Sequence, residues 1–299
     1  MPTLLITWEL GGGQGHLVPL LPIIRRLRAL GYRVYAAVRE LAQVDRILGG
    51  LGVSYLQAPI KAKRTADRID PLRTFAHILH NSGYSDPAEL KAMLEAWRNL
   101  FKFVRPDLVL CDHAPTAILA ARTCQAKTAV IGSGFCCPPD TYPLPDFRPV
   151  MPDASARLKQ DENRVLANVN NVLNRFGAAS LERLAQLYAE VDATFLTTFA
   201  DLDHYPNRTA PDYYGVWPGP DGATPEWPDT VGTRIFAYLH PFQNLPNLLG
   251  YFNQLRCPTI VYVPRIDPKL KDKFQSPTLR FASGRLDLTA VGSTCDLAV

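Results

Sequence analysis

The chain has 299 residues, of which 47% are hydrophobic and 20% are charged, and its formal net charge is +4. These values are typical of a globular protein with room for two domains, and they exclude a disordered chain. The weak, dispersed positive charge gives no reason to expect a nucleic-acid partner. No apolar run reaches the roughly 18 residues that a membrane span needs, so we expect no transmembrane segment.

The cysteines and the first residues bear on the cellular compartment. The six cysteines include no CxxC pair and no spacing typical of a zinc site. In a chain of this size they are interpreted as reduced thiols, and the first apolar run follows no basic leader. We therefore expect a cytoplasmic protein, whose oligomeric state the sequence leaves open.

The opening residues predict the first unit of a doubly wound α/β domain. A strand is predicted at 4–8, and four glycines follow it at positions 11, 12, 13 and 15. Apolar residues then recur at helical spacing from Leu17 until Gly31, and a second strand is predicted at 32–38. A strand, a glycine-rich turn, a helix and a strand in this order are typical of such folds.

The alternation of strands and helices continues in a predicted first domain at 1–216. A helix at 42–48 and a strand at 53–57 imply a parallel sheet with right-handed crossovers. Asp86 and Pro87 have the residue types that begin a helix. The later elements are a helix at 74–80, a helix ending before Pro106, a strand at 108–111, a helix at 114–123, a strand at 129–132, a helix at 164–188 with a break at Gly177, and a strand at 193–197.

Two segments interrupt this pattern. Residues 61–73, KAKRTADRIDPLR, are polar and basic. They are interpreted as a solvated loop or, alternatively, as a contact surface for an acidic ligand. Residues 138–152 form a long proline-rich loop, and long loops inside compact domains are usually lids or binding walls.

A proline-rich linker is predicted at 217–233, and a second Rossmann-like domain begins at 234. Strands are predicted at 234–239, 259–264, 278–281 and 295–299, and helices at 245–255 and 287–291. Together these elements amount to about half of an α/β domain. The expected fold class is therefore α/β, with a doubly wound parallel sheet in the first domain and an incomplete second one.

The glycine-rich turn GGGQGH can hold a ligand because glycines let the backbone turn tightly and approach closely. A dinucleotide-binding turn is one interpretation, and Glu40 ends the second strand where a ribose-binding acid would lie. The spacing is not G-x-G-x-x-G, however, because His16 takes the place of a later glycine.

His16 is the sharpest candidate for chemistry. It follows the first strand, at the edge where open α/β sheets bind ligands. Asp112 ends a later strand and would face the same crevice if both strands belong to one parallel sheet. A histidine base works better with a carboxylate on its other nitrogen, although Asp112 is equally suited to capping the next helix. His113 is the second candidate and should point away from Asp112.

Three segments resemble nucleotide-sugar-dependent glycosyltransferases of the two-Rossmann (GT-B) type, especially the UDP-glucosyl/glucuronosyltransferase-like members that act on small molecules. They are GGGQGHLVPLLPIIRRLRALGYRV from Gly11, PDLVLCDHAPTAILAA from Pro106, and LDLTAVGSTCDLAV from Leu286. The resemblance runs from one end of the chain to the other and is most specific in the first segment.

The resemblance implies inverting transfer of a sugar to a hydroxyl of a small-molecule acceptor, with no metal and no cofactor besides the nucleotide sugar as substrate. His16 matches the general base, and Asp112 matches the acid that orients it. The first domain would hold the acceptor, with walls from the variable segments 61–85 and 135–152, and the second domain would hold the donor. The remaining implied contacts are the turn residues Gly12, Gly13, Gln14 and Gly15, and the acceptor-wall residues His113, Phe135 and Tyr142.

The chain departs from the family in two places. The paired glycines that open the donor-binding helix would come directly after Val299, and residues 238–241 replace a small serine-containing turn. We therefore expect a truncated chain with little transferase activity of its own. An NAD(P)- or flavin-binding oxidoreductase and a non-catalytic small-molecule-binding relative remain as alternatives.

Overall fold

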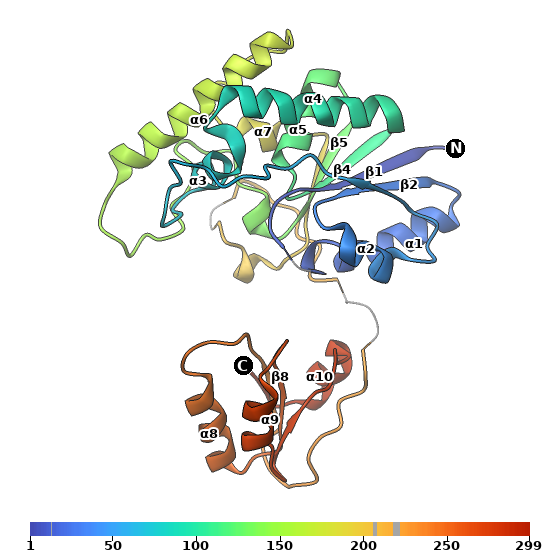
Figure 1. Ribbon diagram of the computed structural model, residues 1–299, viewed down its shortest axis with the longest axis vertical. Helices are drawn as coiled ribbons and strands as arrows, with labels where there is room; N and C mark the ends of the chain where they lie inside the picture. Colours follow the sequence, from blue (N-terminus) through green and yellow to red (C-terminus); the bar gives the residue numbers. More distant parts are fainter. Residues whose placement is uncertain (13, 206–207, 218–221) are drawn as a thin grey trace. The chain divides into compact units, whose positions relative to one another are not determined.

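The computed structural model describes residues 1–12, 14–205, 208–217 and 222–299 (Figure 1). The chain forms two compact units, Met1–Trp217 and Pro218–Val299. The predicted linker is divided between them, because Trp217 packs in the first unit and Trp227 packs against the core of the second. The expected roles of the two units in acceptor and donor binding stay predictions.

The first unit is built on a six-stranded parallel sheet. Its strands are β1 (Thr3–Trp8), β2 (Arg33–Val38), β3 (Ser54–Gln57), β4 (Leu108–Asp112), β5 (Thr128–Gly132) and β6 (Ala193–Leu196). Their order is β3-β2-β1-β4-β5-β6, as the doubly wound interpretation predicts. The chain changes its direction of winding between β1 and β4, which pair directly. In that pair Trp8 lies opposite Asp112.

Helices cover both faces of this sheet (Figure 1). One face packs against α1 (Leu21–Ala29) and α2 (Leu41–Leu48) through Leu4, Ile6 and Trp8. The other face packs through Leu5 against five helices, because successive strand residues point to opposite sides. These are α3 (Phe75–Leu79), α4 (Pro87–Val104), α5 (Pro115–Cys124), α6 (Ser155–Arg175) and α7 (Gln186–Ala189).

Helix α4 forms where the sequence predicts it. The Asp86 carboxylate accepts a hydrogen bond from the Ala88 amide at 2.8 Å, and Pro87 occupies the first turn. The buried face is the predicted apolar stripe, which consists of Leu90, Met93, Leu94, Trp97, Phe101 and Val104. Trp97 also donates a hydrogen bond to Glu9 after β1, so the helix is fixed to the sheet by a polar contact as well.

Two predicted helices begin elsewhere. The helix after β1 starts at Leu21 instead of Leu17, after the 3-10 turns η1 (Gln14–His16) and η2 (Val18–Leu20), because Pro19 and Pro22 favour turn and first-turn positions. Helix α6 starts nine residues before the predicted 164, at Ser155. Its first turns bury the acids Asp161 and Glu162, so an apolar period does not reveal them.

The second unit contains a four-stranded parallel sheet in the order β10-β7-β8-β9. Its strands are β7 (Ile235–Tyr238), β8 (Thr259–Tyr262), β9 (Leu279–Phe281) and β10 (Leu297–Ala298), and its helices are α8 (Leu245–Leu255), α9 (Pro268–Phe274) and α10 (Leu288–Thr294). Helix α9, PKLKDKF, is not predicted from the sequence, because this short helix buries none of its residues. Across the described residues, no helix is both long and apolar enough to cross a membrane.

Candidate active site

His16 and Asp112 meet at the carboxyl ends of β1 and β4. His16 ends the turn η1, and its Nδ1 lies 3.1 Å from Asp112 Oδ1. Trp8 stacks on the imidazole with ring centroids 5.2 Å apart and planes 23° apart. A carboxylate can only accept, so this contact places the proton of a neutral ring on Nδ1 and leaves a lone pair on Nε2.

The side chain of Asp112 is largely buried. Its side chain is 8% exposed, against 17% for His16. Burial raises the pKa of the Asp112 carboxyl, while the hydrogen bond and the charge of His16 lower it. A charged imidazolium therefore gains from this carboxylate, which water screens only weakly.

Gly11 controls access to the free nitrogen of His16. Its φ is +78°, and a Cβ built on it would lie 2.4 Å from His16 Nε2 and 3.4 Å from His113 Nδ1. Glycine is required here on both counts, since a side chain would be strained and would cover Nε2. Substrate binding is predicted from the sequence for the glycines after this one and not for Gly11, whose only signal is its place as the first glycine after the strand.

The glycines at 12 and 15 have few neighbouring atoms. A Cβ on Gly12 would lie 3.6 Å from Glu40 Oε1, and one on Gly15 would meet no atom within 4 Å. Gly13 and the side chain of Gln14 lie outside the described residues. Their predicted substrate-binding role stays a prediction.

His113 lies beside His16 although it follows Asp112 directly. Its backbone is left-handed, with φ +47°, and its ring centroid is 5.7 Å from that of His16. Burial, together with the charges of His16 and Arg39, lowers the pKa of His113 to about 3, so the ring is neutral. Its Nε2 is buried and has no hydrogen-bond partner among the described residues.

Phe135 and Tyr142 are predicted to form the aromatic wall, and of the two only Phe135 contacts the ring of His113 among the described residues. Phe135, in the turn η4 (Gly134–Cys136), meets the ring of His113 edge-on at 6.1 Å. Tyr142 takes no part in these ring contacts among the described residues. It is 48% exposed, and its hydroxyl donates to Asn163 of α6 at 3.1 Å.

Glu9 is a second buried acid at the same edge of the sheet. One of its carboxyl oxygens accepts from Trp97 Nε1 at 2.9 Å, and the other accepts from the Thr116 amide at the start of α5. Burial raises the pKa of Glu9 and these bonds lower it, and the resulting pKa is about 8. The carboxyl is therefore mostly protonated at neutral pH. Glu9 is not predicted from the sequence, where its signal is an acid directly after a buried strand.

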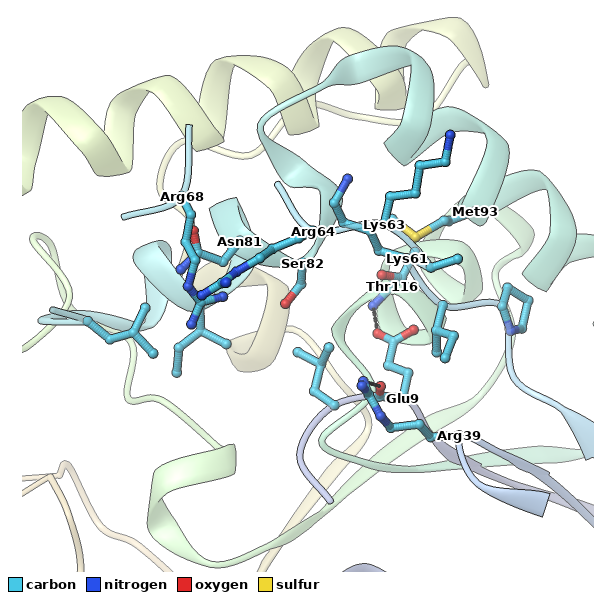
Figure 2. A pocket seen from close by; sticks show the side chains of 16 residues that line it. Glu9, Arg39, Lys61, Lys63, Arg64, Arg68, Asn81, Ser82, Met93 and Thr116 are labelled. Carbon is cyan, nitrogen blue, oxygen red and sulfur yellow. Dashed lines mark hydrogen bonds between the residues drawn. The ribbon is translucent and has the colours of Figure 1, made fainter. Parts of the chain in front are cut away.

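Glu9 lines a cavity of about 310 Å³ over the carboxyl ends of β1, β2 and β3 (Figure 2). The basic segment 61–68, Leu72, the helices α3, α4 and α5, and the turn at 81–82 contribute the remaining walls. The lining residues are Glu9, Leu10, Arg39, Pro59, Ile60, Lys61, Ala62, Lys63, Arg64, Arg68, Leu72, Ile78, Asn81, Ser82, Met93 and Thr116. Within the described residues, no group of three or more His, Cys, Asp and Glu side chains could hold a metal ion.

No protein-family model and no curated protein matches this sequence. Solved structures match it in fold. SnogD, a glycosyltransferase from Streptomyces nogalater, has a TM-score of 0.61 and 16% identity over 99% of this chain and 75% of its own. CalG4, the calicheamicin glycosyltransferase, has a TM-score of 0.66 and 14% identity over 99% of this chain and 74% of its own.

SsfS6, a glycosyltransferase from Streptomyces sp. SF2575, matches with a TM-score of 0.57 and 16% identity over 100% of this chain and 75% of its own. At these identities the likeness shows the fold and not the activity. Both the doubly wound sheet of the first unit and the parallel sheet of the second belong to this architecture. The chain therefore has the two-Rossmann, GT-B fold of these glycosyltransferases.

Proposed function

We propose that these residues belong to an inverting glycosyltransferase, which moves a sugar from a nucleoside diphosphate to a hydroxyl of a small molecule. The observation that carries the proposal is the contact between His16 Nδ1 and Asp112 Oδ1. It leaves His16 Nε2 as a proton acceptor that Gly11 keeps uncovered. The likeness of the fold to glycosyltransferases supports the same reaction.

In the proposed reaction the acceptor hydroxyl donates its proton to His16 Nε2. The acceptor oxygen attacks the anomeric carbon from the face opposite the leaving group. As the new carbon–oxygen bond forms, the bond to the diphosphate breaks, and the nucleoside diphosphate leaves with the electron pair. A single displacement inverts the anomeric configuration. Asp112 stabilises the imidazolium that forms, as a buried carboxylate does in other histidine bases.

We assign acceptor binding to the first unit, which contains His16 and Asp112, and donor binding to the second. SsfS6 and the spinosyn rhamnosyltransferase SpnG were each solved with thymidine diphosphate. Thymidine and uridine diphosphate sugars are therefore the donors to test first. Following the family resemblance, we propose that the transfer needs no metal.

The test is sugar transfer by the product of the whole reading frame that contains these residues, with chain 1–299 assayed beside it. Each sample is incubated with uridine or thymidine diphosphate sugars and a panel of phenols and alcohols, and products are identified by mass. We expect transfer by the whole product and little turnover by chain 1–299. Tight binding of NAD(P) or flavin without binding of either diphosphate would favour the oxidoreductase alternative.

The variant His16→Ala separates an enzyme from a non-catalytic relative. Loss of a general base should lower kcat by roughly 10²–10⁴-fold. The unfolding midpoint of the variant is measured in parallel, to show that the fold persists. A loss smaller than about tenfold, in a folded variant, would remove His16 from the role of base.

A further inference from the structure

We propose that the cavity beside His16 binds an anionic group of the acceptor, a carboxylate or a phosphate. This inference rests on the proposed function and adds the chemical class of the acceptor. Five of the sixteen lining residues are cationic, namely Arg39, Lys61, Lys63, Arg64 and Arg68, and Glu9 is the one acid among them.

The charges of this lining are only partly neutralised. Lys61 forms an ion pair with Glu89, and Arg39 donates to the main-chain oxygen of Glu9 at 3.0 Å. Over the described residues, Lys63, Arg64 and Arg68 have no acidic side chain within ion-pair distance. Figure 2 shows Arg64 and Arg68 reaching the same end of the cavity, on the side of Asn81 and away from Glu9.

The single acid of the lining does not oppose an anion. Glu9 is buried and mostly protonated at neutral pH, so it adds little negative charge to the cavity. Glu9 also accepts the hydrogen bond of the Thr116 amide at the start of α5, so this amide is not available to an anion. The free donors that remain for an anion are therefore side chains, and an arginine fork suits a carboxylate or phosphate with two oxygens.

Hydrogen bonds hold the backbone of the basic segment, although the side chains of Lys63, Arg64 and Arg68 are exposed. Thr65 is buried, and its hydroxyl donates to the Asn81 main-chain oxygen at 2.8 Å. The Asn81 side chain accepts from the Ile69 amide and donates to the Ile69 oxygen, both at 2.9 Å. His80 Nε2 lies 3.0 Å from the oxygen of Asp67. These bonds on both sides of Arg68 fix the backbone that carries it, which lowers the entropy cost of binding.

The cavity adjoins the predicted base through a fixed piece of chain. Leu10 lines the cavity, and the next residue, Gly11, faces His16 Nε2. Leu10 is held from two directions, since its oxygen accepts from Trp8 Nε1 at 2.7 Å and its amide donates to the His113 oxygen at 3.0 Å. An acceptor can therefore place its anionic group among the arginines and its hydroxyl near His16.

The apolar lining residues and the cavity volume indicate the size and polarity of the rest of the acceptor. Seven residues give the cavity an apolar wall, namely Leu10, Pro59, Ile60, Ala62, Leu72, Ile78 and Met93. A volume of about 310 Å³ is at the small end of the range for ligand pockets. The occupant is thus a compact amphipathic acid with an apolar body.

The test compares four phenols that differ in one group: 4-hydroxyphenylacetate, 4-hydroxyphenyl phosphate, the neutral alcohol tyrosol and the cation tyramine. Their affinities for chain 1–299 are measured by calorimetry or NMR at low salt. We expect at least one acid to bind about tenfold more tightly than tyrosol, and tyramine to bind more weakly still. Comparison of the two acids distinguishes carboxylate from phosphate.

The double variant Arg64→Gln/Arg68→Gln should reduce the affinity for the acid to about that for tyrosol. The matched control, Arg25→Gln/Arg26→Gln, removes the same charge from exposed positions on α1 and should leave that affinity within about twofold. Equal affinity for tyrosol and the acids would overturn the proposal. So would an equal loss in both double variants, or no binding of either acid at about 10 mM.

The binding measurement is independent of sugar transfer. Affinities for the four phenols are measured on chain 1–299 without a sugar donor, so they do not depend on turnover. Acid binding that depends on Arg64 and Arg68, without transfer by the whole product, would uphold the anion site and refute the proposed function. Transfer to tyrosol as efficient as transfer to the acids would refute the anion site alone.

Discussion

Nδ1 of His16 lies 3.1 Å from Oδ1 of Asp112, although 96 positions separate the two residues in the chain. The contact exists because β1 and β4 pair in parallel and their carboxyl ends coincide at Trp8 and Asp112. His16 follows one strand and Asp112 ends the other. The contact between this histidine and this carboxylate thus follows from the strand order of the sheet.

Replacing Asp112 by Asn should reverse the tautomer of His16. An amide can turn its NH₂ toward Nδ1 and so move the ring proton to Nε2, where it blocks proton acceptance. We expect kcat of the whole product to fall by about 10²–10⁴-fold. Nitrogen NMR of the imidazole in chain 1–299 reports the tautomer without any assay of transfer. An unchanged tautomer would contradict the orienting role of Asp112.

Replacing Gly11 by Ala should damage the site more than its backbone strain explains. The new Cβ would meet His16 Nε2 at 2.4 Å, in a residue with φ +78°. We expect a loss of about 1–3 kcal/mol of unfolding free energy and a large loss of transfer. Denaturant unfolding and kcat are the measurements.

The control for this variant is Gly31→Ala. Gly31 has φ +83°, and a Cβ there meets no atom within 4 Å. It should show the cost of a left-handed residue, about 1–2 kcal/mol, without loss of transfer. If Gly31→Ala and Gly11→Ala impair transfer equally, the steric argument at His16 is wrong.

Glu9 should make the protein less stable as the pH rises. Its pKa is about 8 in the folded protein against an ordinary value of 4.5, so between these values the folded state holds a proton that the unfolded state has released. The stabilisation is complete below pH 4.5 and is lost as the pH rises to 8, by at most about 1.4 kcal/mol per pH unit. Glu9→Gln should flatten this dependence.

Unfolding by denaturant at pH 5, 6.5 and 8 provides the measurement for Glu9. The control is Glu182→Gln, which removes an acid whose side chain is 84% exposed and should leave the slope unchanged. An identical slope in the Glu9 variant and the parent chain would contradict the assignment.

Removal of divalent metals should leave transfer intact. The proposed step uses His16 for the proton and Asp112 for the charge, so excess EDTA should change the rate of the whole product by less than about twofold. Rates with EDTA and with added Mg²⁺ or Mn²⁺ are compared. A loss that added metal restores would show that the metal-independent proposal is incorrect.

Local sequence signals account for most of the fold. Asp86, Pro87 and the apolar period that follows predict α4, and the short apolar runs predict the strands. Prediction failed where structure depends on distant partners. The first turns of α6 bury Asp161 and Glu162, whose partners include His77 and the Leu144 amide, and no periodicity shows such contacts.

For the candidate site too, some residues could be predicted from local sequence and others depend on distant side chains. The position of His16 and Asp112 at strand ends could be read from the sequence, because parallel strands bring their carboxyl ends to one edge. Glu9 and Gly11 could not be assigned, because the role of each depends on a side chain that arrives from elsewhere. Trp97 reaches Glu9 from α4, and the His16 ring turns back over Gly11.

Successive residues at the end of β1 contact helices on opposite faces of the sheet. Trp8 belongs to the core shared with α1 and α2 and stacks on His16, whereas Glu9 bonds to α4 and α5 beneath the cavity. The ring that stacks on His16 and the hydrogen bonds that hold Glu9 therefore involve opposite faces of one sheet. Substitutions in residues 61–73 can thus change the cavity without touching the stacking contact between Trp8 and His16.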